Sequence, residues 1–292
     1  MYGRVCIGCC IKQNVIFLQR IVENMVKIGY LFNDFQIIFF YDESTDGTLG
    51  AVKNLTSTYD NVTIIENLTP LNQKAPRTHK IAYARNGILD VIRDSYADYE
   101  YFIMMDGDEV CCGDANLDVL ENALKRDDWD GISFSKEHYY DLWAIGMTDI
   151  PYSCWNFDHP RGLYTYSHEI GVALDTCKKG ELLPVYSAFC GFGLYRTNKF
   201  IDSKYDGSPR MDLIPTRLLK ANVKKCGPIK KTHQGAEQQE QDEDMAIAYD
   251  CEHRAFHLYA VFVNTARMRI MNDILFPTDT ELEEHAMNCG YM

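Results

Sequence analysis

The sequence lacks any apolar stretch that approaches the roughly 20 residues needed to cross a bilayer. Its first ten residues, MYGRVCIGCC, turn polar too early for the apolar core of a secretory signal. We therefore expect a cytoplasmic protein without a membrane span. Internal repeats and Pro- or Gly-rich linkers are also missing, so we expect a single domain over residues 1–292.

The chain has little positive charge. Its 29 Lys and Arg residues stand against 42 Asp and Glu residues, a formal net charge of −13. A protein that binds a nucleic-acid duplex normally presents a basic face, so we expect no nucleic-acid partner. A second Cys-x-x-Cys at zinc-ribbon spacing is missing after Cys6, Cys9 and Cys10. This favours buried free thiols over a structural zinc site.

Strand and helix patterns alternate through the first half. Apolar runs predict strands, and stretches with helical spacing of apolar residues follow them. The strands are expected at 5–10, 35–41, 62–66 and 101–105, with helices at 15–29, 47–59 and 78–96. Such alternation predicts an α/β fold with a mainly parallel central sheet flanked by helices. Residues 1–110 make up this regular half.

The second half, residues 111–292, is less regular. We expect a helix at 117–125, strands at 131–135 and 188–195, and an amphipathic helix at 256–271. Residues 139–166 are rich in aromatics and poor in periodicity. Residues 234–244 are polar and acidic, which predicts a mobile loop.

The most informative motif is Asp106, Gly107, Asp108 and Glu109, directly after the buried strand pattern at 101–105. Open α/β sheets bind ligands beyond the carboxyl ends of their strands. Carboxylates there suit a hard cation such as Mn²⁺ or Mg²⁺ held against a phosphate. The alternative is an acidic turn that caps the next helix, which explains two alternate acids less well.

Two further segments favour a nucleotide. Asp42 follows the second strand, where an acid can bind a nucleobase or ribose, although turn and cap chemistry explains it equally simply. Arg77, Lys80 and Arg85 open a helix, where basic side chains and the helix dipole favour a diphosphate. The alternative for the basic cluster is a solvated face.

The second half holds other candidates. Glu252 and His253 stand together, and His253 lies four residues before His257. His253 could be a further metal ligand or a structural histidine. Aromatic and glycine residues that suit contact with a sugar or an acceptor are Trp143, Phe189 and Gly191, with ordinary core packing as the alternative.

The order of these motifs resembles nucleotide-sugar-dependent glycosyltransferases of the GT-A fold. The matching segments are residues 42–48, Arg85 with Asn86, and 106–108. Residues 139–144, 187–193 and 251–253 are similar to a narrower group, the glycosyltransferases of large algal DNA viruses and the fungal capsule mannosyltransferase-like proteins. The likeness spans roughly residues 5–257. For a viral chain the compartment would be the host cytoplasm.

The resemblance implies transfer of a sugar from a nucleotide-diphosphate sugar to a glycan or glycoprotein acceptor. Residues 1–110 would then form a nucleotide-sugar-binding half, and residues 111–292 would form an acceptor-side half. The site residues it implies are Asp42, Asn86, Asp106 and Gly107 on the donor and Asp106, Asp108 and His253 on Mn²⁺ or Mg²⁺. UDP is the first choice of nucleotide and GDP the second. By analogy we expect retention of configuration. An inverting enzyme would need a base, for which Glu252, Asp141 and Asp212 are candidates.

Other functions fit parts of the pattern. The string Met105-Asp-Gly-Asp-Glu-Val110 also fits a haloacid-dehalogenase-like phosphatase. In that fold the motif follows the first strand, whereas here three strand–helix units precede it. A sugar nucleotidyltransferase would use the same metal site. A non-catalytic carbohydrate-binding protein would keep the aromatics, but it would have no use for the acid pair and the basic segment.

Overall fold

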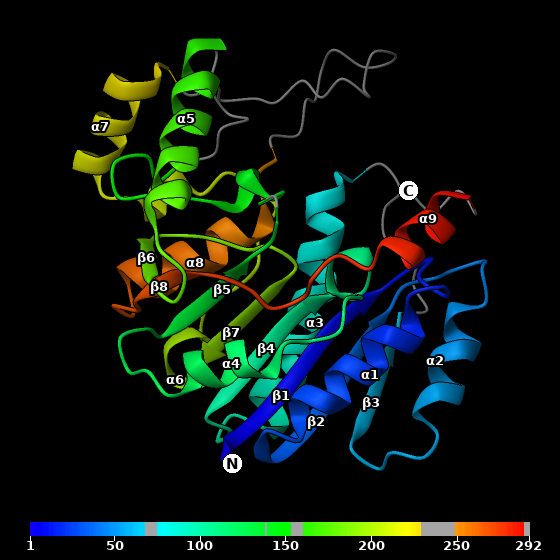
Figure 1. Cartoon of the computed structure of the whole chain (residues 1–292). Coiled ribbons are helices and arrows are strands. Elements are labelled where there is room, and N and C mark those ends of the chain that lie inside the picture. Colours follow the sequence, from blue (N-terminus) through cyan, green and yellow to red (C-terminus); the bar gives the residue numbers. More distant parts are fainter. Residues whose placement is uncertain (68–74, 138, 153–159, 229–248, 289–292) are drawn as a thin grey trace.

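A computed structural model of the chain describes residues 1–67, 75–137, 139–152, 160–228 and 249–288. An eight-stranded sheet in the order β3-β2-β1-β4-β7-β5-β8-β6 runs through these residues (Figure 1). The strands are β1 (Tyr2–Ile11), β2 (Phe32–Tyr41), β3 (Val62–Glu66), β4 (Tyr101–Asp106), β5 (Gly131–Ser135), β6 (Leu182–Val185), β7 (Phe192–Arg196) and β8 (Met268–Ile274).

Helices connect and cover the strands. They are α1 (Leu18–Gly29), α2 (Thr48–Thr56), α3 (Arg77–Ser95), α4 (Leu117–Leu124), α5 (Pro160–Thr176), α6 (Thr197–Phe200), α7 (Thr216–Cys226), α8 (Glu252–Phe262) and α9 (Thr280–Asn288). Short 3₁₀ turns include η1 (Glu109–Cys111), η2 (Leu142–Ala144) and η4 (Met211–Leu213). Helices α5 and α7 contact each other and project from one end of the sheet (Figure 1). None of the helices in the described residues is long and apolar enough to cross a membrane.

The first four strands are parallel, and their carboxyl ends lie at one edge of the sheet. Ile11 of β1 pairs with Tyr41 of β2, and Cys10 pairs with Asp106 of β4. The residues that follow these strands therefore emerge beside one another. This register brings Lys12, Asp42 and the acidic motif to a common place. The predicted α/β fold with a mainly parallel sheet flanked by helices is confirmed.

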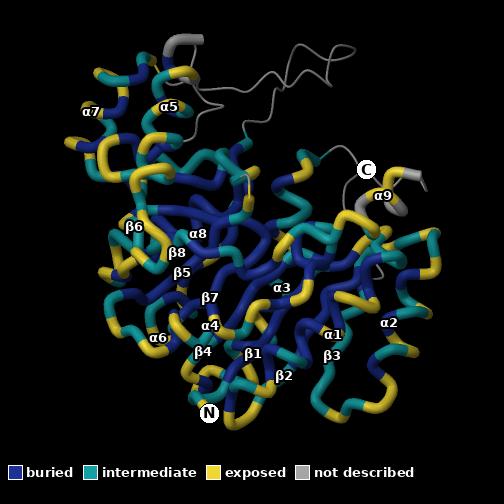
Figure 2. The backbone as a smooth tube through the Cα atoms, in the orientation of Figure 1, coloured by how far each residue is buried: buried dark blue, intermediate teal, exposed yellow. Residues whose placement is uncertain are grey.

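The second half adds strands to the same sheet. β7 runs antiparallel between β4 and β5, and β8 pairs parallel with β5 and antiparallel with the edge strand β6. Because side chains alternate along a strand, the sheet has a core on each face. One core joins the β1 side chains Val5, Ile7 and Cys9 to α1, α2 and α4. The other joins Cys6 and the β4 side chains Phe102 and Met104 to α3, α5, α6 and α8. Figure 2 shows the buried strands between more exposed helices.

Several expectations for the second half were wrong. The helix expected at 256–271 ends at Phe262, and β8 occupies Met268–Ile274. Between them Thr265 has a φ of 57°, which a helix does not accommodate. The strand expected at 188–195 begins at Phe192, because the φ of +81° at Gly191 interrupts the extended backbone. Helix α5 begins within the stretch that showed no period, and residues 234–244 lie outside the described residues.

Candidate functional site

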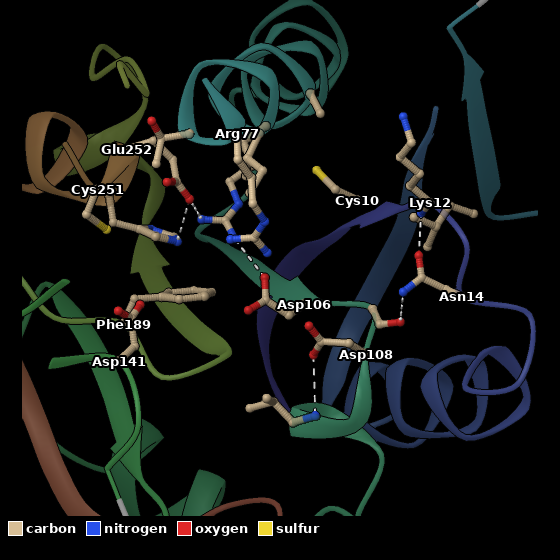
Figure 3. A pocket seen from close by; sticks show the side chains of 18 of the residues that line it. Cys10, Lys12, Asn14, Arg77, Asp106, Asp108, Asp141, Phe189, Cys251 and Glu252 are labelled. Carbon is tan, nitrogen blue, oxygen red and sulfur yellow. Dashed lines mark hydrogen bonds and ion pairs between the residues drawn. The ribbon is translucent and has the colours of Figure 1, made fainter. Parts of the chain in front are cut away.

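A cavity of about 840 Å³ opens beyond the carboxyl ends of β1, β2 and β4. The beginning of α3 forms one wall. The beginning of α8 forms another, together with Lys136, Glu137, Tyr140, Asp141 and Trp143. Of the residues predicted from the sequence, those lining it are Asp42, Arg77, Lys80, Arg85, Asp106, Gly107, Asp108, Asp141, Trp143, Phe189, Glu252 and His253. Figure 3 shows Asp106 and Asp108 side by side, with Glu252 across from Asp106.

Hydrogen bonds with the surrounding backbone hold Asp106 and Asp108 of the acidic motif in place. The backbone N–H of Asp106 donates to the carbonyl of Gly191 at 2.8 Å, which holds the end of β4 against the beginning of β7. Asp108 Oδ1 accepts from the N–H of Val110 at 3.3 Å and so caps η1. Burial, and then the charges of Asp106 and Glu109, raise the pKa of Asp108 to about 8. Negative charge is therefore crowded here, which is an environment that a bound cation relieves.

Arg85 connects this edge to α8. Its Nη2 donates to Asp106 Oδ1 and its Nη1 to Glu252 Oε1, both at 2.7 Å. The Arg85 side chain is only 5% exposed. Although burial disfavours its charge, Glu252 and Asp106 raise the pKa of Arg85 well above its ordinary value. The guanidinium is therefore a permanent positive charge between two carboxylates.

Asp42 forms a second polar group at the end of β2. Lys12 Nζ donates to Asp42 Oδ2 at 2.5 Å, and Asn67 Nδ2 donates to Oδ1 at 3.0 Å. Burial opposes ionisation of Asp42, but these two hydrogen bonds outweigh it and hold the pKa of the carboxyl below its ordinary value. Asp42 is thus an oriented, ionised acceptor at the cavity rim.

The beginning of α3 supplies positive charge. Arg77 is the first residue of the helix, and both Arg77 and Lys80 line the cavity. The unpaired N–H groups of a helix N-terminus and its dipole favour anions. This end of the cavity can therefore receive the negative charge of a phosphate.

Aromatic side chains and Asp141 form the wall on the side of the second half. Tyr140 Oη donates to Asp106 Oδ2 at 3.4 Å, and Trp143 and Phe189 line the same wall. Asp141 caps η2 by accepting from the N–H of Ala144 at 3.2 Å. Burial, and then the charge of Glu252, raise the pKa of Asp141 to about 7. Asp141 can therefore exchange a proton near neutral pH.

His253 packs against Phe189 in the cavity wall. The two rings stack with centroids 3.6 Å apart, and His253 Nε2 lies 3.7 Å from Glu252 Oε1. Burial, and then the charge of Arg85, lower the pKa of His253 well below its ordinary value, so the ring is neutral. His257 is satisfied structurally, because Ser187 Oγ and Tyr195 Oη lie 3.1 and 3.0 Å from its two ring nitrogens.

Asp106 and Asp108 are hard oxygen donors that fit Mn²⁺ or Mg²⁺. Across the described ranges, no three His, Cys, Asp or Glu side chains come together as a metal cluster, so His253 does not complete a triad with the two aspartates. A two-carboxylate site suits Mg²⁺, which commonly keeps one or two protein carboxylates and leaves positions for phosphate and water.

Three predicted residues do not line the cavity. Asp212 lies in η4 and pairs with Arg210 at 2.7 Å, with its side chain 61% exposed. The Asn86 side chain forms two hydrogen bonds with the backbone of Tyr205. Its Nδ2 donates to the Tyr205 carbonyl at 2.8 Å, and its Oδ1 accepts from the Tyr205 N–H at 3.0 Å. Gly191 lies beneath the site, where a Cβ would come within 2.4 Å of Val110.

Several lining residues were not predicted, namely Lys12, Asn14, Lys136, Tyr140 and Thr278. Lys12 and Asn14 directly follow β1, so the rule applied to the ends of β2 and β4 would have found them. Asn14 Nδ2 donates to the carbonyl of Gly107 at 2.7 Å and steadies the acidic turn. Thr278 follows β8, which the sequence pattern did not reveal.

No protein-family model and no curated protein matches the sequence. Solved structures that match it at low identity include TarS, a mannosyltransferase and a glucosyl-3-phosphoglycerate synthase. TarS 1–349 of S. aureus is 13% identical with a TM-score of 0.45, and the match covers 98% of this chain and 64% of that one. TarS has also been solved with UDP-GlcNAc.

Two other matches come from different organisms. A mannosyltransferase of Pyrobaculum calidifontis, in complex with GDP-Man and Mn²⁺, is 16% identical with a TM-score of 0.40, over 70% of this chain and 48% of that one. The M. tuberculosis glucosyl-3-phosphoglycerate synthase is 11% identical with a TM-score of 0.40, over 77% of this chain and 67% of that one. The chain thus spans less than two thirds of the length of TarS 1–349. At these scores no residue role passes from those proteins to this chain.

Proposed function

We propose that the protein is a metal-dependent glycosyltransferase that moves a sugar from a nucleotide-diphosphate sugar to a glycan or glycoprotein acceptor. The observation that carries the proposal is the meeting, in one cavity, of the Asp106 and Asp108 carboxylates with the basic beginning of α3. A cation at the carboxylates and the helix end together suit a diphosphate. The cavity volume, about 840 Å³, lies in the range of ligand pockets.

Each wall has a role in this proposal. Asp42, oriented by Lys12 and Asn67, receives hydrogen bonds from the base or ribose, with UDP the favoured nucleotide and GDP the second. Asp106 and Asp108 hold Mn²⁺ or Mg²⁺, which when bound neutralises charge on the leaving diphosphate. Arg77 and Lys80 face the same phosphates. Trp143 and Phe189 offer apolar faces to a sugar or acceptor.

The stereochemical course of the transfer depends on whether a carboxylate in the cavity acts as a base. Retention of configuration, which we propose, needs no base for the acceptor hydroxyl. Inversion would need one, and Asp141 suits that role better than Glu252. The pKa of Asp141 is raised to about 7, whereas Glu252 is held in its ion pair by Arg85. Loss of about 10²–10⁴-fold in kcat on Asp141→Asn would therefore favour inversion with Asp141 as the base.

The decisive test is calorimetric titration of UDP and GDP, each with and without Mn²⁺. We expect metal-dependent binding of one nucleotide to the wild type, weakened by more than about tenfold, or 1.4 kcal/mol, in Asp108→Ala. Asp118→Ala is the matched control, since Asp118 lies on α4 and outside the cavity. Absence of nucleotide binding to the wild type would reject the proposal. Release of free phosphate or pyrophosphate instead of nucleoside diphosphate would favour a phosphatase or a nucleotidyltransferase.

A further inference from the structure

We propose that Arg85 is a positioning residue. Without the donor, its guanidinium pairs with Asp106 in place of a metal ion, and it releases Asp106 to the metal when the donor binds. The inference rests on the proposed function and gives Arg85 a different role from the diphosphate contact expected from the sequence. It also implies that Glu252 keeps its ion pair with Arg85 when the metal is bound.

The contacts of Arg85 join three elements. The residue belongs to α3, and its two terminal nitrogens bind Asp106 at the end of β4 and Glu252 at the beginning of α8, each at 2.7 Å. The Glu252 side chain is 7% exposed, and that of Asp106 is 21% exposed. All three residues line the cavity, but Asp106 is the more exposed partner of Arg85 and Glu252 the more buried one.

Aromatic faces complete the binding place of the guanidinium. The Arg85 Cζ lies 4.8 Å from the ring centroid of Phe189 and 5.7 Å from that of Tyr205. Tyr205 is fixed in turn by its two hydrogen bonds with Asn86, the residue next to Arg85 in α3. These π faces favour a cation, so the guanidinium keeps stabilising neighbours even when it gives up one carboxylate.

The positions of the charges make Arg85 and a metal ion competitors. A divalent cation on Asp106 and Asp108 would lie close to the guanidinium that occupies Asp106 Oδ1. Two positive charges at such a distance repel each other, and partial burial strengthens the repulsion. Arg85 therefore weakens metal binding until the diphosphate adds its own negative charge. This arrangement keeps Asp106 and Glu252 neutralised between turnovers.

The test is Mn²⁺ affinity in the absence of nucleotide, measured on the full chain from the electron paramagnetic resonance signal of free Mn²⁺. Arg85→Gln keeps polar side-chain atoms but removes the charge. We expect it to bind Mn²⁺ at least about tenfold more tightly than the wild type. Arg85→Lys keeps the charge, and Arg20→Gln removes an exposed charge on α1, so both should stay within about threefold of the wild type. General structural damage would weaken Mn²⁺ binding, so tighter binding distinguishes competition from a merely structural role.

Equal or weaker Mn²⁺ binding by Arg85→Gln would overturn the inference, as would a tightening of the same size in Arg85→Lys. If Arg85→Gln does not fold, a crystal structure of the wild type with Mn²⁺ and UDP gives an independent answer. We expect the nitrogens of Arg85 to lie beyond about 4 Å from the Asp106 carboxylate and to remain on Glu252. An intact Arg85–Asp106 ion pair in that complex would overturn the inference.

The two proposals fail separately. Nucleotide binding by the wild type together with unchanged Mn²⁺ affinity in Arg85→Gln rejects the role of Arg85 alone. Tighter Mn²⁺ binding by that variant, with no nucleotide bound by any protein, keeps the competition between Arg85 and the metal ion but rejects the donor and the release of Asp106 that depends on it.

Discussion

Single carboxyl groups in this cavity differ widely in their tendency to ionise. Asp42 is ionised by its hydrogen bonds, whereas burial and neighbouring charges raise the pKa values of Asp108 and Asp141. Sequence alone gives these residues the same chemistry. In the function that we propose, their environments give Asp42 the role of an acceptor for the nucleotide, Asp108 that of a metal ligand, and Asp141 that of a group that titrates near neutral pH.

Asp141 should make the stability of the protein depend on pH. Its pKa of about 7, above the ordinary 3.8, means that the folded protein binds this proton more tightly than the unfolded chain does. The associated stability is fully present below about pH 4 and is lost as the pH rises through about 7. Asp141→Asn cannot ionise and keeps an oxygen for the N–H of Ala144. We therefore expect the variant to be more stable than the wild type at pH 8, by at most about 4 kcal/mol, and nearly equal to it at pH 4.

Urea unfolding of both proteins at several pH values measures this difference. Asp212→Asn is the control, because Arg210 lowers the pKa of the exposed Asp212, and we expect no gain at pH 8. A loss of stability in Asp141→Asn at pH 8 would show that the folded protein stabilises the ionised form.

Among the elements, the junction of β4 and β7 controls the geometry of the site. Gly191 has a φ of +81° directly before β7, and its carbonyl accepts from the N–H of Asp106 at 2.8 Å. Val110 fills the space where a side chain on Gly191 would lie. The acidic turn and the start of β7 therefore depend on the absence of a side chain at this position.

We expect Gly191→Ala to lower the free energy of unfolding by about 3 kcal/mol, from the left-handed backbone and from crowding by Val110. Gly180→Ala is a matched control, because its φ is +78° but nothing lies within 4 Å of its added Cβ. It should lose only about 1 kcal/mol. Urea unfolding measures both. Adding Val110→Ala should restore part of the loss in Gly191→Ala, and equal losses in the two glycine variants would contradict the crowding.

How well the sequence predicted an element depends on where in the chain the segments that pair with it lie. The parallel strands β1, β2 and β4 contain runs of buried residues that point to both faces of the sheet, so they stand out as apolar runs that end in polar residues. β8 has the mixed sequence MRIMNDI. It forms a strand because it pairs with β5 and β6, which are distant in the chain. The residues of the site fall into the same two groups, those predictable from the local sequence and those that depend on distant contacts. Strand ends revealed Asp42, Asp106 and Asp108, whereas the ion pair between Arg85 and Glu252 joins residues 167 positions apart and depends on tertiary packing.

On the scale of the whole molecule, the two halves share one sheet and both cores. β7, from the second half, contacts β4 of the first, and α8 packs beside α3. We propose that residues 1–292 form a single domain, with the nucleotide bound mainly by residues 1–110 and the acceptor by residues 111–292. The cavity lies where these two halves meet.

A single domain should unfold in one cooperative transition. Calorimetric scanning should show one peak, and a nucleotide with Mn²⁺ at about 100 times its Kd should stabilise the whole protein by about 2.7 kcal/mol. For a chain of 292 residues that corresponds to a rise in Tm of about 4 °C. Two peaks, of which the ligand moves only one, would show that the halves unfold separately.

The position of β7 also has a consequence for synthesis on the ribosome. One edge of β4 pairs with β7, yet residues 192–196 follow Asp106 only after a long intervening segment. At about 5–20 residues per second, the newly made β1 to β4 would wait several seconds with the β4 edge unpaired. Such an edge invites association with other chains. A truncated protein that ends after the acidic motif should therefore aggregate, and the nascent full-length chain should depend on chaperones during this interval.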